Sequence, residues 1–207
     1  MARLIQRGAE AEICLDTWLG RQVVVKRRVP KPYRIAEIDD LLRRQRTRKE
    51  VMLLYEARCA GVATPVVYDV DLEDMAITMQ HIDGQRVKDV IDTLNGEEQR
   101  ILCRSIGENA GRLHRGGIVH GDLTTSNLIC WHDHIFFIDF GLGEKNEGTE
   151  QRGVDLHLLM EALTAAHTNP RLFAWVMEGY TATFPDAETV RRTVDDIASR
   201  GRYTVKP

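Results

Sequence analysis

Three side chains that could carry chemistry follow one another in the middle of the sequence. Asp122 lies in the stretch from His120 to Asn127, Asn127 ends that stretch, and Asp139 follows twelve residues later in front of Phe140-Gly141. Phosphoryl transfer from ATP needs such a set, because one carboxylate orients or deprotonates the attacking hydroxyl while two other oxygen donors hold Mg²⁺ on the phosphates. Each residue alone would suit an ordinary turn or strand end. Together, at these spacings, they predict a phosphoryl-transfer site.

A lysine upstream could complete this site. Lys26 ends the apolar run Val23-Val24-Val25, where a single ammonium group can reach the α- and β-phosphates of a nucleotide. The alternative is a basic strand end that faces solvent, since Arg27 and Arg28 follow directly. Glu50 and Glu56 both fall in a helical stretch downstream, and the spacing leaves open which of them pairs with Lys26.

The elements that must position these residues change character along the chain. The first part is rich in strands and has one helix, expected to begin near Thr47 and to end at Gly61. A break near residues 80–84 leads into a mostly helical second part, with a strand pair just before Asp139. The predicted strands are residues 11–15, 21–27, 66–70, 75–80, 128–131 and 135–138. This order predicts an α+β fold with two lobes that share a cleft.

Composition narrows the class of protein. The chain has 207 residues, of which 43% are hydrophobic and 29% charged, enough for one core or two small lobes. Its four cysteines lie far apart without a CxxC pair, which argues against a zinc site or a disulfide framework and favours the reducing cytoplasm. No run approaches the roughly 18 apolar residues of a membrane span. We therefore expect a cytoplasmic protein with no membrane partner.

Charge is distributed unevenly although the net charge is only −3. Residues 21–58 hold twelve Lys and Arg against five Asp and Glu, and the chain from Arg191 onward is again basic. Such blocks usually form solvated helix faces. The alternative is a basic surface for a phosphate-rich partner, and the sequence pattern leaves both open.

Several motifs resemble those of one kinase family. The sequence is similar to the small atypical kinase subunits of the KEOPS (EKC) complex, the PRPK type, which are related to the RIO kinases, and the likeness covers essentially the whole chain. The matching stretches are residues 7–11 (RGAEA), 25–28 (VKRR), 33–34 (YR), 46–50 (RTRKE), 60–62 (AGV), 64–65 (TP), 120–127 (HGDLTTSN), 138–143 (IDFGLG), 153–156 (GVDL) and 200–202 (RGR).

This resemblance implies a minimal two-lobed protein kinase-like fold with a short activation segment. Residues 1–80 would form a β-sheet lobe with one long helix, and residues 81–207 a mostly helical lobe. The second lobe would contain the catalytic loop, residues 118–141, and a basic C-terminal tail, residues 199–207. Asp155 would tie its helix to the catalytic loop.

The resemblance also implies a role for each matching side chain, with ATP and Mg²⁺ as cofactors. Asp122 would be the catalytic residue, Asn127 and Asp139 the metal ligands, and Lys26 the phosphate-binding lysine held by Glu50. The nucleotide would further be covered by a loop and contacted at its adenine end by a gatekeeper and a hinge: Gly8, Ala9, Glu10 and Ala11 for the loop, Met79 as gatekeeper, and Gln80 and Ile82 at the hinge.

The sequence departs from that of ordinary kinases at several positions, and these departures narrow the activity that we expect. The nucleotide loop has a single glycine and a carboxylate, Glu10, that would not suit phosphates unless it points away. Gly121 stands where ordinary kinases have an arginine, and Thr124 where they have a lysine. Only 13 residues separate Gly141 from Asp155, too few for a segment that docks peptides. These features favour an ATPase, or a kinase that acts on itself or a tethered partner.

The function implied is that of an ATP-dependent serine/threonine kinase or ATPase subunit of KEOPS. It would support threonylcarbamoyladenosine modification of tRNA, with the threonylcarbamoyltransferase subunit and other KEOPS subunits as partners and tRNA contacted through the complex. The tail would lie near the ATP cleft at that interface, or else form a frayed end.

Two other functions remain as alternatives. A small-molecule phosphotransferase of the aminoglycoside or choline kinase type would need a helical insertion, for which the 66 residues after Gly141 leave little room. A pseudokinase scaffold would bind nucleotide only to hold its partners. The presence of all four polar site residues argues against it: Lys26, Asp122, Asn127 and Asp139.

Overall fold

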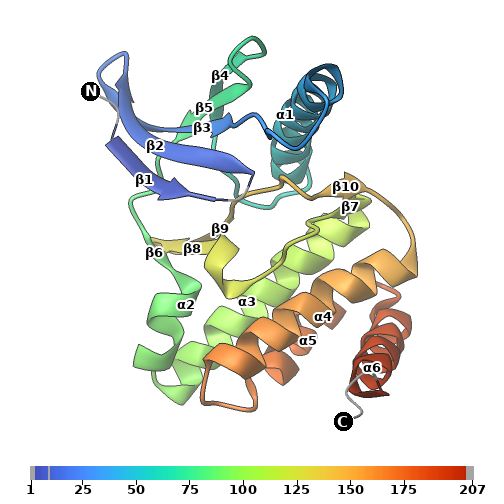
Figure 1. Ribbon diagram of the computed structural model, residues 1–207. Helices are drawn as coiled ribbons and strands as arrows, with labels where there is room; N and C mark the ends of the chain where they lie inside the picture. The colour runs from blue at the N-terminus through green and yellow to red at the C-terminus, as the bar shows by residue number, and fades with distance from the viewer. Residues whose placement is uncertain (1–2, 9, 204–207) are drawn as a thin grey trace.

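The computed structural model describes residues 3–8 and 10–203. Its first part is a five-stranded antiparallel sheet with the strand order β1-β2-β3-β5-β4 and one long helix, α1 (Figure 1). The strands are β1 (Arg3–Arg7), β2 (Ala11–Trp18), β3 (Arg21–Arg28), β4 (Val67–Asp71) and β5 (Ala76–Gln80), and α1 is Ala36–Cys59. Since α1 contacts β4 and β5, it covers one side of the sheet.

The central strand β3 carries the candidate lysine. A two-residue turn, Leu19-Gly20, joins β2 to β3, and both residues have the positive φ, 47° and 77°, that a hairpin of this length requires. This register places Lys26 opposite Ile13 of β2 and Ile77 of β5. Side chains alternate between the faces of a strand, so Lys26 and Arg28 share the buried face while Arg27 faces solvent.

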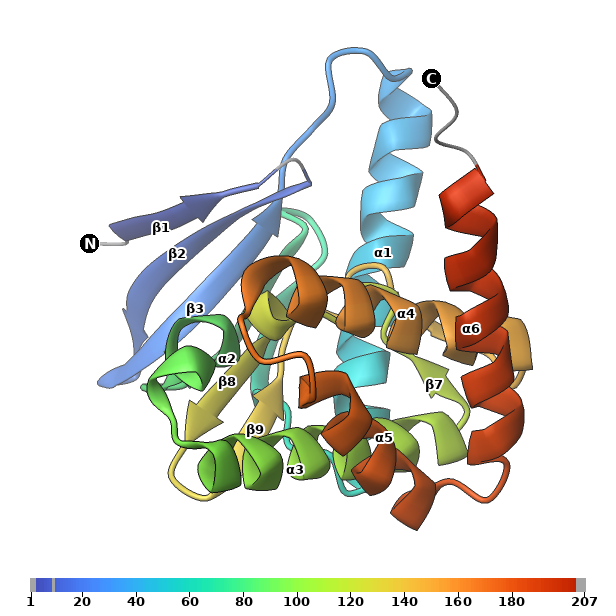
Figure 2. The same ribbon diagram turned by 90° about the horizontal axis from the view of Figure 1, so that it is seen from below.

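The second part is mostly helical and lies below the sheet in Figure 1. Figure 2, seen from below, shows α4 crossing α6, and the two helices are in contact. The helices are α2 (Val87–Val90), η1 (Ile91–Thr93), α3 (Gly96–Arg115), η2 (Thr125–Asn127), α4 (Thr149–Ala166), α5 (Leu172–Thr183) and α6 (Ala187–Tyr203).

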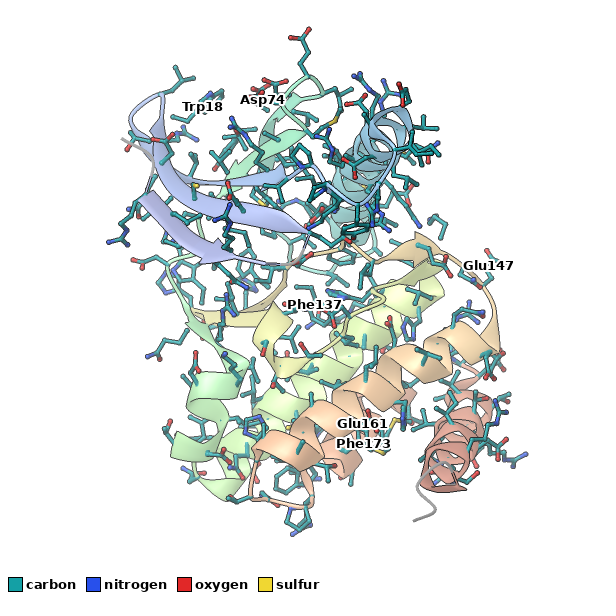
Figure 3. The ribbon with its side chains drawn as sticks, viewed as in Figure 1. Trp18, Asp74, Phe137, Glu147, Glu161 and Phe173 are labelled. Carbon is teal, nitrogen blue, oxygen red and sulfur yellow. The ribbon has the colours of Figure 1, made fainter. Side chains whose placement is uncertain are left out.

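Two small sheets carry the predicted catalytic loop between the lobes. One contains β6 (Gln85–Arg86), β8 (Leu128–Trp131) and β9 (His134–Phe137), and the other pairs β7 (Ile118–Val119) with β10 (Glu144–Lys145). Figure 3 shows Phe137 at the junction of the sheet lobe and the helices. Its side chain is fully buried and its backbone N–H donates to Ala63 O at 2.8 Å. The division into lobes at residue 80 stays a proposal.

One hydrophobic core runs through both parts. Leu53 and Leu54 of α1 belong to the same buried cluster as Phe137 and the apolar faces of α3, α4 and α5. The five-stranded sheet meets this cluster through Val67 of β4, so α1 is the main element that joins the first part to the helices.

Glycines bring two helices of this core into backbone contact. A Cβ added at Gly179 of α5 would come within 1.9 Å of Arg104 O, and one at Gly107 of α3 within 1.8 Å of Val176 O. These distances are far below any real contact. The α3–α5 crossing therefore requires glycine at both positions.

The helix that carries Glu50 is longer than predicted. It begins at Ala36 and not near Thr47, so Glu50 lies in the middle of α1. In its first turns Ile38 and Leu41 are exposed, and the turns are held by charge instead. Asp39 is buried and accepts hydrogen bonds from Lys31 N, Arg34 Nη1 and Arg43 Nε. Contacts between charged side chains across a loop give no period that a sequence pattern could show.

The ends of the chain also differ from expectation. The strand β1 was not predicted, since its residues are exposed on both faces. At the other end α6 continues to Tyr203, so the first part of the predicted basic tail is helical, while residues 204–207 lie outside the described residues. Among the residues described, no helix combines the length and apolar character needed to cross a membrane.

The glycine crossing predicts a stability effect. Gly179→Ala should lower the free energy of unfolding by about 1–3 kcal/mol, since backbone of α3 cannot move aside as a side chain could. Urea denaturation followed by circular dichroism measures this. Gly96→Ala is the matched control, because nothing lies within 4 Å of a Cβ there and the exchange should be neutral or stabilising by up to about 1 kcal/mol. Equal midpoints for the two variants would contradict the packing argument.

Candidate active site

A cleft of about 240 Å³ lies between the sheet and the helical lobe. It gathers seven of the predicted site residues: Lys26, Glu50, Met79, Gln80, Ile82, Asn127 and Asp139. A second cavity, of about 200 Å³, shares Lys26 and Asp139 with the first and is lined by Gly8, Glu10, Ala11 and Asp122 as well. The remaining predicted residue, Ala9, lies outside the described residues. Segments distant in the sequence thus converge at one place.

Lys26 is the cation at the centre of the cleft. Its Nζ lies 2.6 Å from Glu50 Oε1 and 2.6 Å from Asp139 Oδ1. Burial alone would lower the pKa of this amine, but the carboxylates of Glu50 and Asp139 hold the pKa above its ordinary value. Lys26 is therefore a charged donor, with its third N–H available to a further acceptor such as a phosphate oxygen.

The partner of Lys26 is Glu50, as the family resemblance implies. The other candidate, Glu56, lies nearer the end of α1 and pairs with Lys145 of β10 at 2.9 Å. Glu50 is 1% exposed, whereas the side chain of Glu56 is 31% exposed. Glu50 is buried beside β3 and Glu56 is not. This difference, which the helical pattern of the sequence could not show, identifies Glu50 as the partner of Lys26.

Asp139 points its carboxylate into the cleft from a strained backbone. Its φ is +63°, a conformation that Asp tolerates better than most residues. Although burial raises the pKa of this carboxyl, the neighbouring Lys26 ammonium lowers it below the ordinary value overall, and a hydrogen bond from Gly141 N adds to this. Asp139 is thus ionised near neutral pH, as a metal ligand must be.

Asn127 orients Asp122. The Asn127 Nδ2 atom donates to Asp122 O at 2.9 Å and to Asp122 Oδ2 at 2.8 Å. With its nitrogen engaged in both bonds, the amide has only its oxygen to offer a cation. This arrangement fixes one carboxylate oxygen of Asp122, and Asn127 lines the same cleft as Asp139.

The donor set fits Mg²⁺ as kinases hold it. Mg²⁺ prefers a few oxygen ligands from the protein, completed by phosphates and water. Asp139 supplies an ionised carboxylate and Asn127 an amide oxygen. Within the described part of the chain, no three His, Cys, Asp or Glu side chains gather to form a separate metal centre.

A buried aspartate on α4 holds the start of the catalytic loop. Asp155 is fully buried and accepts hydrogen bonds from His120 N at 2.6 Å and Gly121 N at 2.7 Å. His114 of α3 contacts the same carboxylate through Nε2 at 3.2 Å. This geometry confirms the expectation that Asp155 ties its helix to the loop.

His120 connects the two carboxylate segments, a role that sequence reasoning missed. Its Nδ1 accepts from Asp122 N at 3.3 Å, so the proton sits on Nε2, which donates to Ile138 O at 3.1 Å. Burial lowers the pKa of this imidazole despite the nearby Asp155, Asp139 and Asp122. A neutral ring can make both bonds, whereas an imidazolium would lose the first. The first position of the His-Gly-Asp triplet was the available signal.

Gly121 explains one departure from ordinary kinases. Its φ is +78°, and a Cβ at this position would come within 2.3 Å of Leu142 O. Any side chain there would therefore collide with the segment that follows Phe140-Gly141. An arginine at this position would not fit the path of this chain.

That segment is short and folds back on the protein. In β10, Glu144 pairs with Val119 of β7, and Lys145 Nζ donates to Gly116 O at 3.1 Å. Helix α4 then begins at Thr149. The segment is occupied in contacts with α1 and with the catalytic loop.

Glu10 lines the second cavity, but its carboxylate is held by two arginines. It forms an ion pair with Arg46 of α1, and Arg34 lies 3.7 Å from its other oxygen. Burial raises the pKa of Glu10, but Arg46 outweighs this and lowers it overall. The connection between β1 and β2 is therefore tied to α1 by charge. Gly8 N also closes the loop by donating to Ala11 O at 2.9 Å.

Comparison with known proteins agrees with this geometry. The RIO domain family model matches residues 23–144. The KEOPS complex subunit Bud32 of Pyrococcus abyssi is 42% identical over 97% of this chain and 96% of its own length. The Probable bifunctional tRNA threonylcarbamoyladenosine biosynthesis protein of Methanosarcina barkeri is 41% identical over 98% of this chain, which spans only 36% of that longer protein.

A solved structure supports the fold independently. WaaP in complex with acyl carrier protein superposes with a TM-score of 0.68 over 98% of this chain and 86% of that one. At 15% identity this likeness concerns the fold alone. The fold is the two-lobed, kinase-like one that the sequence predicts. On the family match and the relatives together, the chain belongs to the RIO domain family and to the Bud32 family of KEOPS complex subunits.

Proposed function

We propose that this chain is an ATP-dependent, Mg²⁺-requiring atypical serine/threonine kinase or ATPase that acts as a KEOPS subunit. One observation carries the proposal: Lys26, paired with Glu50, faces Asp139 across the cleft, while Asn127 directs Asp122 toward the same space. The family supports kinase-type chemistry, since the RIO domain covers all of these residues.

ATP would lie along the two adjoining cavities. Met79, Gln80 and Ile82 line the first cavity and would surround adenine, with Met79 as gatekeeper. Lys26 would bind the α- and β-phosphates with its remaining N–H. The loop of Gly8, Ala9, Glu10 and Ala11 would cover the phosphates, and the ion pair of Glu10 with Arg46 supports this, because it offsets the negative charge of the loop's carboxylate.

Asn127 and Asp139 would hold Mg²⁺, which neutralises charge on the phosphates when bound. Asp122 would orient the attacking hydroxyl or water and accept its proton. The hydrogen bond from Asn127 Nδ2 holds Oδ2 of Asp122, which leaves Oδ1 to meet the nucleophile. His120 would keep Asp122 and the segment before Asp139 in a fixed relation through its two ring nitrogens.

The acceptor is water, the protein itself or a tethered partner rather than a free peptide. Thr124 contributes no positive charge toward a transferred phosphoryl group. The segment after Gly141 is held against β7 by β10, where an ordinary kinase would dock a peptide. These two features favour ATP hydrolysis or self-phosphorylation over broad protein kinase activity.

The relatives support the assignment to tRNA modification. The archaeal protein that matches this chain over nearly its whole length is named a KEOPS subunit, and longer relatives are named for tRNA threonylcarbamoyladenosine biosynthesis. We therefore assign the chain a threonylcarbamoyltransferase subunit and other KEOPS subunits as partners, with tRNA contacted through the complex. Location in the cytoplasm stays a prediction.

The first test concerns the two carboxylates. Asp122→Ala and Asp139→Ala should each lower kcat for ATP turnover by about 100-fold or more, the first by losing proton transfer and the second by losing the metal. Extra ATP should not rescue Asp139→Ala. A malachite green phosphate assay measures turnover. Asp133→Ala, at the exposed tip of the β8–β9 hairpin, serves as control. Wild-type turnover by Asp122→Ala would refute the assigned site.

The second test concerns the acceptor. With radiolabelled ATP, generic serine and threonine peptides should take up less than about one-hundredth of the label found as free phosphate or on the protein, because the cleft lacks the lysine and the docking segment of ordinary kinases. Saturable labelling of a free peptide at the rate of ATP turnover would contradict this acceptor assignment.

The third test concerns the C-terminal tail, whose residues 204–207 lie outside the described part. Deleting residues 200–207 should leave nucleotide affinity unchanged. In the reconstituted complex it should lower tRNA-stimulated turnover and reduce the salt slope of tRNA binding by about one unit per lost phosphate contact. A variant with Arg191→Gln and Arg192→Gln, exposed on the same helix, is the charge control. Full tRNA modification by the truncated chain would overturn the role of the tail.

A further inference from the structure

A second buried cation, Arg28, lies beside Lys26 and lines the second cavity, and the function proposed above gives it no role. Arg28 follows Lys26 by two residues on β3 and is 4% exposed. Its Nη2 donates to Glu50 Oε2 at 2.6 Å, while Lys26 occupies Glu50 Oε1. The Glu50 carboxylate is therefore held at both of its oxygens by neighbours on a single strand.

This double hold restricts Glu50 more than one ion pair could. A carboxylate bound at one oxygen can rotate about its bond to the lysine. Bound at both oxygens, from two points of a rigid strand, it is fixed in position and in plane. Removing it from this place would leave the buried Arg28 without its ion-pair partner and Lys26 with Asp139 alone, which is strongly unfavourable.

Arg28 also lies against the segment that carries the candidate metal ligand. A Cβ added to Gly141 would come within 3.2 Å of Arg28 Nη2 and 3.4 Å of Lys26 Nζ. Both head groups therefore lie close to the backbone that follows Asp139. Arg28 connects three elements at one point: strand β3, helix α1 through Glu50, and the Asp139–Gly141 segment.

The hydrogen bonds of Arg28 are incomplete, which argues against a purely structural purpose. Its Nε is buried and has no partner among the described residues. A buried donor without a partner is unfavourable for folding and calls for an explanation in the site it occupies. An apolar side chain would avoid that unpaired donor but would leave Glu50 Oε2 without its cation.

We propose that Arg28 is a positioning residue that fixes Glu50 so that Lys26 stays directed into the cleft. In protein kinases the corresponding Lys–Glu pair is assembled under the control of the activation segment. In this chain Arg28, a second cation on β3, takes over that role and holds the Lys26–Glu50 pair in place. The pair therefore forms without an activation segment that controls it. This inference rests on the proposed phosphoryl-transfer function.

The test is a double-mutant cycle with Arg28→Met and Glu50→Gln, made in the full-length chain. Arg28→Met alone should lower kcat for ATP turnover about tenfold or more. In the Glu50→Gln background the same change should lower it less than about threefold, since a residue that acts through Glu50 has nothing left to position. Arg28→Lys should restore activity only in part, because a single ammonium lacks the guanidinium fork.

The control is Arg27→Met on the same strand. Arg27 is exposed and pairs with Asp74, which Figure 3 shows at the outer end of the sheet, so this change should leave turnover within twofold. Wild-type turnover by Arg28→Met would overturn the proposal. So would additive losses in the cycle, since these would mean that Arg28 contacts the nucleotide directly. If circular dichroism shows that Arg28→Met does not fold, Arg28→Lys takes its place in the cycle. The loss expected in the wild-type background is then smaller, and it should again shrink in the Glu50→Gln background.

Nucleotide binding separates this proposal from the proposed function. The Kd for Mg²⁺-ADP is measured by calorimetry for every corner of the cycle. If the wild-type chain turns ATP over no faster than Asp122→Ala, the proposed function fails. The coupling between Arg28 and Glu50 is then calculated from the Kd values of the four corners alone. Additivity in Kd then rejects the positioning role, and non-additivity supports it.

Discussion

A single buried carboxylate, that of Glu50, holds the cleft together. Lys26 and Arg28 of β3 bind its two oxygens, and Lys26 extends the chain of charges to Asp139 on the far side of the cleft. Burial makes these contacts strong, and it also makes each partner indispensable, because any one left alone would be an uncompensated charge in a region of low dielectric. The spacing between sheet, helix and catalytic segment follows from this requirement.

The catalytic loop is built on a comparable principle in the other lobe. Asp155, wholly buried, accepts two backbone N–H groups from the start of the loop, and the neutral ring of His120 spans from Asp122 N to Ile138 O. Rigid elements therefore define both ends of the site. Leu142 passes so close to Gly121 that a Cβ there would come within 2.3 Å of Leu142 O, which ties the segment after Gly141 to the loop.

Two buried charged groups thus hold the site: Glu50 with its two cations, and Asp155 with the backbone of the loop. One hydrophobic core joins the helices that carry them. Leu53 of α1 and Phe137 of β9 belong to the same buried cluster as the helices below. The charged groups orient the side chains of the site, and the core between them fixes how far apart the two groups lie. This division explains how a chain of 207 residues can form a complete kinase-like cleft with a minimal connecting segment.

The sequence by itself determined the strands around Lys26, the set of Asp122, Asn127 and Asp139, and the family, because hydrophobic alternation and closely spaced motifs are local properties. It could not decide between Glu50 and Glu56, place the start of α1 at Ala36, or reveal the roles of Arg28 and His120. Each of these depends on contacts between residues distant in the chain: Glu56 is taken by Lys145, the first turns of α1 are held by ion pairs across a loop, and Arg28 gains its role only where β3 meets α1. Charge pairs of this kind leave no periodic trace in a sequence, and only the tertiary structure brings them together.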